Sequence, residues 1–327
     1  MEKISAIVMA GYNNKWAVKK YAKIVAEHYG EKFIETGYKP LREFRTLADG
    51  QPVSKPLIQF SLEKLFTNDR IGDIVIVGHQ MLLEQRLGDY LGRQATPFTI
   101  VNQNSRIASE VLKRFQIRTR KVKYRSIAGN MIKGYAASAA CEKRRHALFV
   151  ASDSPLTSQL FINSFLDLAQ TYAAACAITL PAVLVEGHVD RFGRYPLKLI
   201  NDSDFQLPSH TDAFGRHGFR LSSLVYADPH GFDINTANTA YNLRKCLHPN
   251  VQLKLFRITR HLGYENIYSK HFIKKDLSVK EVENITSAFF GGRLKIIPVT
   301  AAESSFDYDG TDDEYRRLAE LLSASPE

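Results

Sequence analysis

The stretch ALFVASDSPLTS, residues 147–158, indicates the fold class of this 327-residue chain. Its apolar start, ALFVA, stops at Ser152-Asp153, and Pro155 prevents a simple continuation of the strand. An apolar run bounded by turn residues is typical of a buried, parallel strand. In open α/β sheets, the carboxyl ends of such strands face the ligand crevice. The stretch therefore predicts an α/β protein with Asp153 at the crevice.

Asp153 has two interpretations at this point. A carboxylate just past a buried strand is well placed to hold a hard cation such as Mg2+. Alternatively, Asp153 caps the helix that begins near Leu156, since Asp, Ser and Thr are favoured cap residues. The stretch alone leaves both interpretations open.

Length and composition limit the classes of protein to which this chain can belong. A chain of 327 residues suffices for one large α/β domain or two modest ones. No run approaches the roughly 20 apolar residues of a membrane span, and the N-terminus lacks the pattern of a signal peptide. The three cysteines are far apart, which argues against a disulfide framework and a Cys-rich zinc site. We therefore expect a cytoplasmic protein without membrane association.

The chain is strongly basic, with a formal net charge of +10 and a pI near 9.4. This balance favours anionic partners, either phosphorylated small molecules or nucleic acid. The stretch RFQIRTRKVKYR, residues 114–125, concentrates the positive charge. A solvated hairpin or helix face is the favoured interpretation of it. Nucleic acid stays possible, but no zinc-finger, RNP-like or basic-zipper motif supports it.

Strand-like and helix-like segments alternate along the chain. Strands are predicted at residues 4–9, 71–77, 98–101, 147–151, 176–180, 219–226 and 294–299. Helices are predicted at residues 16–29, 58–66, 82–91, 130–141, 158–172 and 314–322, and residues 236–291 are mostly helical. This alternation predicts βαβ units and a mainly parallel sheet.

Two glycine-containing turns are candidate anion sites. The first strand ends in Ala10-Gly11 and is followed by Lys15, an order in which backbone N–H groups and a cation can hold a phosphate. An ordinary strand-to-helix turn fits equally well, because neither GxxxxGK[ST] nor GxGxxG is present. At the second turn, Asn130 is predicted to cap a helix, and the pair Gly129-Asn130 could contact a nucleobase or phosphate through backbone N–H groups.

Residues 186–230 are irregular and rich in Gly, Pro, Asp and His. A long non-periodic segment inside an α/β protein is commonly a substrate-binding excursion. Its histidines lack HExxH or comparable zinc-ligand spacing. For the helical residues 236–291, the sequence leaves open a lid, a dimer surface or a structural cap.

The order of these segments resembles the MobA-like nucleotidyltransferases, the NTP-transferase branch of the GT-A fold. AIVMAG, residues 6–11, is similar to that family's opening strand and Gly-rich turn, although GYNNKW stands where GGxSxRMG is typical. GYKPL at 37–41 and KPLIQFSLEKL at 55–65 are similar to its lysine-bearing segment and the helix "KPMIEYVLEAL". LFVASDSPLTS is similar to its "LVLPGDIPLLT", and FDYDGTDDEYRRLAELL at 306–322 to its closing "IDVDTPEDYELA".

The resemblance implies a Rossmann-like GT-A three-layer sandwich with a mainly parallel mixed sheet and a C-terminal helical insertion. It implies one domain over residues 1–327, with 186–230 as an acceptor-side excursion and 236–291 as the insertion. The implied reaction is Mg2+-dependent transfer of an NMP from an NTP to a phosphorylated small-molecule acceptor, with release of pyrophosphate.

The resemblance also implies roles for particular residues. The metal ligands would be Asp153 with Asp309 or Asp307, and the catalytic residues Lys15, Lys39 and Asp153. The nucleotide would be bound by Ala10, Gly11, Lys15, Lys39, Gly129 and Asn130. Candidates for acceptor binding are Arg191, Arg194 and Tyr195.

Two other functions remain open from the sequence. A GT-A glycosyltransferase usually carries DxD after a central strand, where this chain has Ser152-Asp153-Ser154; its DxD triplets stand at 202–204 and 307–309. The altered first loop and the basic stretch also fit a non-catalytic nucleotide- or RNA-binding protein that retains the fold. The sequence indicates neither the base, nor the acceptor, nor the oligomeric state.

Overall fold

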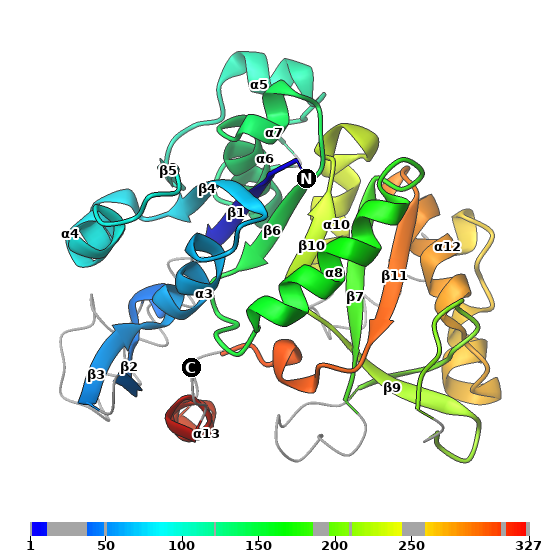
Figure 1. Cartoon of the computed structure of the whole chain (residues 1–327). Helices are drawn as coiled ribbons and strands as arrows, with labels where there is room; N and C mark the ends of the chain where they lie inside the picture. The colour runs from blue at the N-terminus through cyan, green and yellow to red at the C-terminus, as the bar shows by residue number, and fades with distance from the viewer. Residues whose placement is uncertain are drawn as a thin grey trace.

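A nine-stranded sheet forms the centre of the computed structural model (Figure 1). The structure describes residues 2–11, 38–48, 51–120, 122–185, 196–208, 211–243, 259–308 and 312–324. The strands of the sheet are β1 (Ile4–Ala10), β4 (Ile71–Gly78), β5 (Phe98–Asn102), β6 (Ala147–Ala151), β7 (Ile178–Leu184), β8 (Leu197–Ile200), β9 (Arg216–Leu221), β10 (Leu224–Ala227) and β11 (Leu294–Val299). Their order is β5-β4-β1-β6-β10-β7-β9-β8, and β11 pairs with β7.

The pairings confirm a mainly parallel mixed sheet. β5, β4, β1 and β6 pair in parallel, as do β7 and β11. β10 is antiparallel to both β6 and β7, so β6 and β7 point the same way. β9 is antiparallel to β7 and β8 is antiparallel to β9. Within the described residues, β9 and β10 thus run against the other strands of the sheet.

Helices cover both faces of this sheet, which makes the predicted three layers. Alternate side chains of a strand point to opposite faces. Ala6 and Val8 of β1 accordingly pack in the core shared with α3 (Leu57–Phe66), α4 (Gln80–Leu91) and α8 (Gln159–Tyr172). Ile7 packs in the second core, with α6 (Ile127–Ala136), α7 (Ala139–Glu142), α10 (Ile234–Leu243) and α12 (Val279–Phe290). The sequence and the structure therefore agree on an α/β, Rossmann-like architecture.

A hairpin that the sequence analysis did not predict lies outside the sheet. Its strands are β2 (Glu43–Ala48) and β3 (Gln51–Pro56), and it follows a 3-10 turn, η1 (Lys39–Leu41). Phe44 of the hairpin packs with Tyr308 and Leu318 in a third core, which also includes α13 (Asp312–Ala324). In Figure 1 the hairpin and α13 lie at the lower side, below the carboxyl ends of the central strands. This core joins the early hairpin to the last helix.

The prediction of one helix over 130–141, capped by Asn130, is wrong. Ser126 caps α6, since its side chain accepts a hydrogen bond from Gly129 N at 3.0 Å, and Asn130 lies within the helix. The helix ends at Ala136, and α7 (Ala139–Glu142) follows as a separate turn. Ser126 is the N-cap rather than Asn130, because its hydroxyl accepts a hydrogen bond from the backbone N–H three residues later, as N-cap side chains do.

The prediction for residues 186–230 is wrong in part. Residues 186–195, which include the acceptor candidates Arg191, Arg194 and Tyr195, lie outside the described residues. The remainder is less irregular than expected, because it contributes β8, β9 and β10 to the sheet. The single strand predicted at 219–226 is interrupted at Ser222-Ser223, between β9 and β10.

Further along, the described part of 236–291 is helical, as expected. It contains α10, a π-helical turn η3 (Ser269–Lys274) and α12, which ends at Gly291 with a φ of 64°. Only glycine adopts this left-handed conformation readily, so Gly291 stops the helix. No described helix is both long enough and apolar enough to cross a bilayer.

The basic stretch 114–125 is neither a hairpin nor a helix face. α5 (Ser109–Arg114) ends at its first residue, and an irregular loop follows. Phe115, Ile117 and Val122 are buried in the second core, so three apolar side chains hold the loop to the domain. Periodicity could not reveal this, because the buried positions follow no regular repeat.

Candidate functional site

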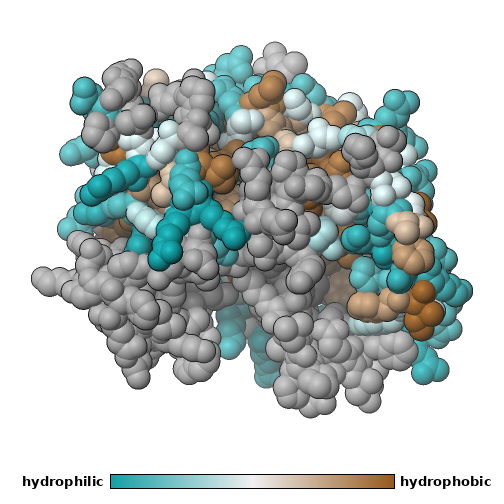
Figure 2. Space-filling model, turned by 90° about the horizontal axis from the view of Figure 1, so that it is seen from below, coloured by the Kyte–Doolittle hydropathy of each residue, from teal (hydrophilic) through white to brown (hydrophobic). Residues whose placement is uncertain are grey.

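Three neighbouring strands end at one edge of the sheet and place the candidate site there. Ala10 of β1 is in register with Gly78 of β4, and Met9 is in register with Ala151 of β6. Gly11 and Ser152-Asp153 follow directly, and Ser152 Oγ donates to Met9 O at 3.1 Å. Figure 2 views the molecule from this lower side and shows hydrophilic side chains gathered on part of it. The edge is the one that usually binds ligands in open α/β sheets.

Asp153 lies beside two other predicted elements of the site. Its carbonyl oxygen accepts a hydrogen bond from Tyr308 N at 2.8 Å. Lys39 Nζ donates to Tyr308 O at 3.2 Å. The Tyr308 ring is 1% exposed and packs edge-on against Phe44, 5.4 Å between ring centroids. A buried tyrosine thus brings Lys39, the closing segment and Asp153 to one place.

The capping interpretation of Asp153 is wrong. α8 begins at Gln159, and its N-cap is Ser158, whose Oγ accepts from Phe161 N at 3.1 Å. Asp153 stands five residues before that cap and is partly exposed. Its carboxylate is therefore not needed to begin the helix.

Asp307, one of the two candidates for a second metal ligand, is engaged by an arginine. Arg220 Nη2 of β9 donates to Asp307 Oδ1 at 2.9 Å. The Arg220 side chain is 13% exposed and the Asp307 side chain 32%, so the guanidinium is largely buried while the carboxylate keeps part of its contact with solvent. The other candidate, Asp309, lies outside the described residues, as does Lys15.

The turn after β1 is packed closely against two side-chain amides. A Cβ at Gly11 would lie 2.6 Å from Asn130 Nδ2 and 2.9 Å from Gln103 Oε1. Asn130 is only 4% exposed, and its Oδ1 has no hydrogen-bond partner among the described residues. Buried carbonyl oxygens nearly always have a partner. An acceptor at this position can receive a hydrogen bond from a bound ligand.

The backbone N–H groups of Gly129 and Asn130 are already used inside the protein. Gly129 N donates to Ser126 Oγ, and Asn130 N donates to Ser126 O at 2.9 Å. A Cβ at Gly129 would lie 2.5 Å from Lys123 O, so this glycine allows α6 to approach the preceding loop. These two N–H groups are therefore not available for the expected contact with a ligand, and Gly129 serves in packing.

Tyr38 supports the first turn, although the sequence analysis did not select it. Its hydroxyl donates to Ala10 O at 2.5 Å and accepts from His79 N at 2.9 Å. The side chain is 4% exposed. A Cβ at Gly78 would lie 2.4 Å from the Tyr38 hydroxyl, so glycine is required there. These contacts join the ends of β1 and β4.

Lys133 is a second residue that the sequence analysis missed. It is 7% exposed, and its Nζ donates to Gln103 O at 2.6 Å, Ser105 O at 3.3 Å and Asn102 O at 3.4 Å. Burial, with a smaller effect of the Arg125 charge, lowers its pKa from 10.5 to about 8. The bonds fix the loop after β5 that carries Gln103. A lysine within an otherwise apolar helix, IAGNMIKGYA, was the available signal.

The residues at this edge fit a magnesium site in which the protein supplies few ligands and the substrate's phosphate oxygens supply others. Among the described residues no three His, Cys, Asp or Glu side chains form a group that could hold a metal. Mg2+ commonly takes only one or two carboxylates and completes its coordination with water and phosphate oxygens. The partly exposed Asp153 carboxylate is the group at this edge that would hold such an ion.

The DxD triplet at 202–204 is used within the fold. Asp202 Oδ1 accepts from Lys280 N at 2.9 Å, and Asp204 Oδ1 lies 3.6 Å from Lys280 Nζ. Both carboxylates thus contact the start of α12. This arrangement does not favour a sugar-nucleotide metal site at the triplet.

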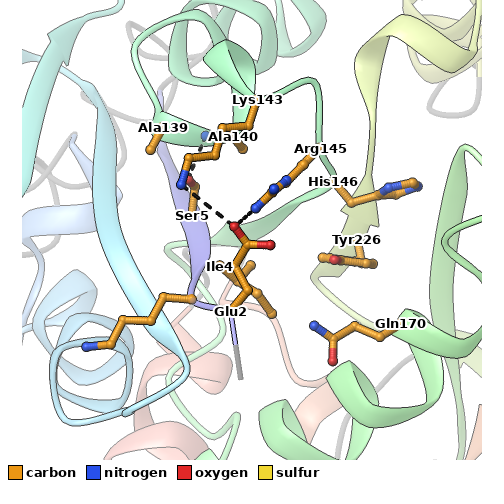
Figure 3. A pocket seen from close by; sticks show the side chains of 11 residues that line it. Glu2, Ile4, Ser5, Ala139, Ala140, Lys143, Arg145, His146, Gln170 and Tyr226 are labelled. Atoms are coloured by element: carbon orange, nitrogen blue, oxygen red, sulfur yellow. Dashed lines mark hydrogen bonds and ion pairs between the residues drawn. The ribbon is translucent and has the colours of Figure 1, made fainter.

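A small cavity lies at the opposite edge of the sheet and does not belong to this site (Figure 3). Its volume is about 80 Å³, too small for a nucleotide, and it is lined by the start of β1. The Glu2 carboxylate points into it and pairs with Lys143 and Arg145. The chain's own carboxylate thus balances these cations.

Comparisons with known proteins give a likeness of fold. No protein-family model and no curated protein matches the sequence. The structure is similar to a hypothetical transferase from Thermus thermophilus, with a TM-score of 0.57 and 19% identity over 96% of this chain and 100% of that one. This likeness shows that the two chains share a fold over nearly their whole length.

Two further solved structures score lower. One is 4-diphosphocytidyl-2C-methyl-D-erythritol synthase from Anaerococcus prevotii DSM 20548, with a TM-score of 0.47, 11% identity and 98% of each chain covered. The other is CMP:2-keto-3-deoxy-manno-octonic acid synthetase complexed with CTP, with a TM-score of 0.47, 10% identity and 98% of each chain covered. Scores below 0.5 do not by themselves establish a common fold.

Proposed function

We propose that this protein is a nucleotidyltransferase of the MobA-like type, which transfers an NMP from an NTP to a phosphorylated small-molecule acceptor and releases pyrophosphate. The observation that carries the proposal is the convergence of Gly11, Asn130, Lys39 and Asp153 at the carboxyl edge of the sheet. It combines a glycine directly after β1, a buried amide acceptor, a cation and a carboxylate, which are the groups that a metal-bound nucleotide needs.

The chain's own residues would act mainly by positioning and by charge. The tight turn at Ala10-Gly11 would admit the nucleotide close to the backbone, and the Asn130 side chain would accept a hydrogen bond from the base. Lys39 would balance charge on the triphosphate as an acceptor oxygen attacks the α-phosphorus and pyrophosphate leaves. Such chemistry depends on orientation and electrostatic stabilisation rather than on a covalent nucleophile.

Asp153 would hold Mg2+, which would neutralise the phosphates and polarise the α-phosphorus. Because Arg220 engages Asp307, we propose Asp309 as the second ligand. Lys15 is proposed to assist on the triphosphate, and Arg191, Arg194 and Tyr195 to bind the acceptor. These last residues lie outside the described part of the chain.

The test is a thermal-shift panel of ATP, GTP, CTP and UTP, each with and without Mg2+. A ligand at a hundred times its Kd stabilises a protein by about 2.7 kcal/mol. We expect one NTP to raise the Tm only when Mg2+ is present. Asp153→Asn should abolish the Mg2+-dependent part of the rise and leave the Tm of the protein alone nearly unchanged.

Asp89→Asn is the matched control, because Asp89 is an exposed carboxylate on α4, away from this edge. The control should respond to NTP as the unmodified protein does. An Asp153→Asn variant that keeps the full Mg2+-dependent shift would refute the assignment of the metal ligand. No shift with any of the four nucleotides would refute the proposed donor site.

A further inference from the structure

The basic loop, residues 114–125, begins at the edge of the sheet opposite the candidate nucleotide site and leads to the start of α6, where Lys123 and Tyr124 lie against Gly129. The proposed function does not use this loop. The start of the loop approaches two turns: the one that follows β10 and the one that precedes β11. Because β10 is antiparallel to the central strands, both turns lie at the same edge of the sheet. The loop's cationic side chains are exposed, whereas its apolar ones are buried. The exposed cations among the described residues are Arg114, Arg118, Arg120, Lys123 and Arg125.

A chain of hydrogen bonds fixes the first of these cations in position. Asp228 Oδ1 lies 2.9 Å from His230 Nδ1 and accepts from Tyr135 Oη at 3.1 Å. Arg114 Nε donates to His230 Nε2 at 3.2 Å, so His230 carries its proton on Nδ1. Arg114 Nη2 also donates to Cys141 O at 2.7 Å. These bonds use two of the five N–H groups of the guanidinium and hold it before any ligand arrives.

The held arginine borders a cavity of about 340 Å³, a size that suits a nucleotide-sized ligand. Arg118 lines the same cavity, together with the rings of Phe115, His230 and Phe232. The Phe115 and His230 rings lie 4.6 Å apart at 35°. The Asp233 carboxylate also lines the cavity, and its oxygens already accept hydrogen bonds from Asn235 and Thr236. Guanidinium groups and ring faces are the groups that bind phosphate and the base plane.

The loop continues this chemistry beyond the cavity. Tyr124 is 39% exposed, and the Arg125 guanidinium lies 5.2 Å from its ring centroid. Exposed aromatic and cationic side chains along one loop are typical of proteins that track a single strand by stacking and phosphate contacts. A flat anionic membrane would use the charges but not a concave site with aromatic walls.

We propose that this edge binds single-stranded nucleic acid, with one nucleotide in the cavity and the neighbouring phosphates on the basic loop. Phosphate oxygens contact Arg114 and Arg118, and the base stacks within the cavity. The cavity lies at the edge opposite the candidate NTP site, and the end of the loop at Lys123 and Tyr124 lies between the two, against the start of α6. A bound NTP therefore leaves the cavity itself open to a polynucleotide.

Fluorescence anisotropy with labelled 12-nucleotide RNA and DNA strands tests this proposal, with a DNA duplex and anionic vesicles as comparisons. We expect single strands to bind more tightly than the duplex, with a Kd that rises with salt, since each phosphate contact contributes about 0.7 to the salt slope. The double variant Arg118→Ala, Arg120→Ala should weaken binding about tenfold or more and reduce that slope. Tyr124→Ala should weaken binding severalfold.

The double variant Arg86→Ala, Arg93→Ala is the matched control, because it likewise removes two positive charges from exposed arginines, on α4 and just beyond it. Its affinity should equal that of the unmodified protein. Equal losses in the control and in the Arg118→Ala, Arg120→Ala variant would overturn the proposal, since binding would then follow net charge alone. Preference for duplex or vesicles, or no binding of single strands at low salt, would overturn it as well.

Photocrosslinking with an iodouracil-substituted strand locates the base independently of these variants. We expect crosslinked peptides that contain Phe115, His230 or Phe232. Crosslinks confined to the opposite edge of the sheet would overturn the assignment of the cavity and would instead indicate that the strand enters the candidate NTP site. Undiminished crosslinking in the presence of saturating NTP is the expected sign of two separate sites.

Discussion

Gly11 shows how little space the first turn leaves for a side chain. Asn130 and Gln103 approach it so closely that even a methyl group has no room. We expect Gly11→Ala to push these amides aside and to weaken NTP binding tenfold or more in a thermal-shift or titration experiment. The protein's own stability should fall by about 1–3 kcal/mol, as overpacking usually costs.

Gly88→Ala provides the matched control for this substitution. A Cβ at Gly88, within α4, would meet nothing within 4 Å. Because alanine favours a helix more than glycine does, this variant should be more stable by about 0.5–1 kcal/mol and should bind NTP normally. Unchanged NTP affinity in Gly11→Ala would show that the nucleotide does not approach this turn.

Tyr38 is the second residue-scale test, because its single hydroxyl joins two strand ends. Tyr38→Phe would leave the Ala10 carbonyl and the His79 amide without this partner. We expect the free energy of unfolding to fall by about 1–3 kcal/mol and the KM for NTP to rise, while Tyr124→Phe, at an exposed hydroxyl, changes neither. A stability loss without any change in KM would confine Tyr38 to a structural role.

At the scale of elements, the loop after β5 depends on one lysine from α6. Between pH 8 and 10.5 the unfolded chain holds more protons than the folded one, because the pKa of Lys133 is lowered to about 8 on folding. The free energy of unfolding should therefore rise with pH across this interval, by about 3 kcal/mol at most. Lys133→Met should be less stable at every pH, since three carbonyl groups lose their donor, and it should lack this rise.

Urea unfolding of both proteins at several pH values from 7.5 to 10.5 provides the measurement. Tyrosines and other lysines titrate in the same range, so the informative quantity is the difference in unfolding free energy between the two proteins. That difference should increase with pH. A constant difference would mean that Lys133 keeps an ordinary pKa in the folded protein.

At the scale of the whole molecule, the described strands argue for a single cooperative unit. The sheet takes strands from residue 4 to residue 299, including β8 to β10 from the segment expected to be an excursion. The third core ties the hairpin near residue 44 to α13 at the end of the chain. We therefore expect one calorimetric transition whose van't Hoff and calorimetric enthalpies agree. Two separable transitions would instead show that residues 236–291 fold as a domain of their own.

The sequence was sufficient for features that depend on neighbouring residues. An apolar run that ends in a turn identified β6. The same pattern located both ends of β1, β4, β5 and β11 to within one or two residues. For β7 it placed the start within two residues, but the strand continues to Leu184, beyond the predicted end at residue 180. The position of Asp153 at the carboxyl edge follows from the strand alone. The alternation of strands and helices along the chain likewise predicted the three-layer α/β architecture, because the hydrophobic periodicity of each segment shows which of its faces is buried.

The tertiary structure decided the features that join distant parts of the chain. Tyr38 reaches Ala10, Lys133 reaches Gln103, and Arg220 reaches Asp307, and no local pattern encodes those pairs. The start of α6, and with it the place of Asn130 inside the helix, likewise depended on the hydrogen bond that the Ser126 hydroxyl accepts from Gly129 N. Side chains become ligands, anchors or counter-charges through partners brought near by folding. The sequence by itself thus determined the layers and the edge at which the candidate site lies, and folding determined which polar groups meet there, since their contacts span tens to hundreds of residues.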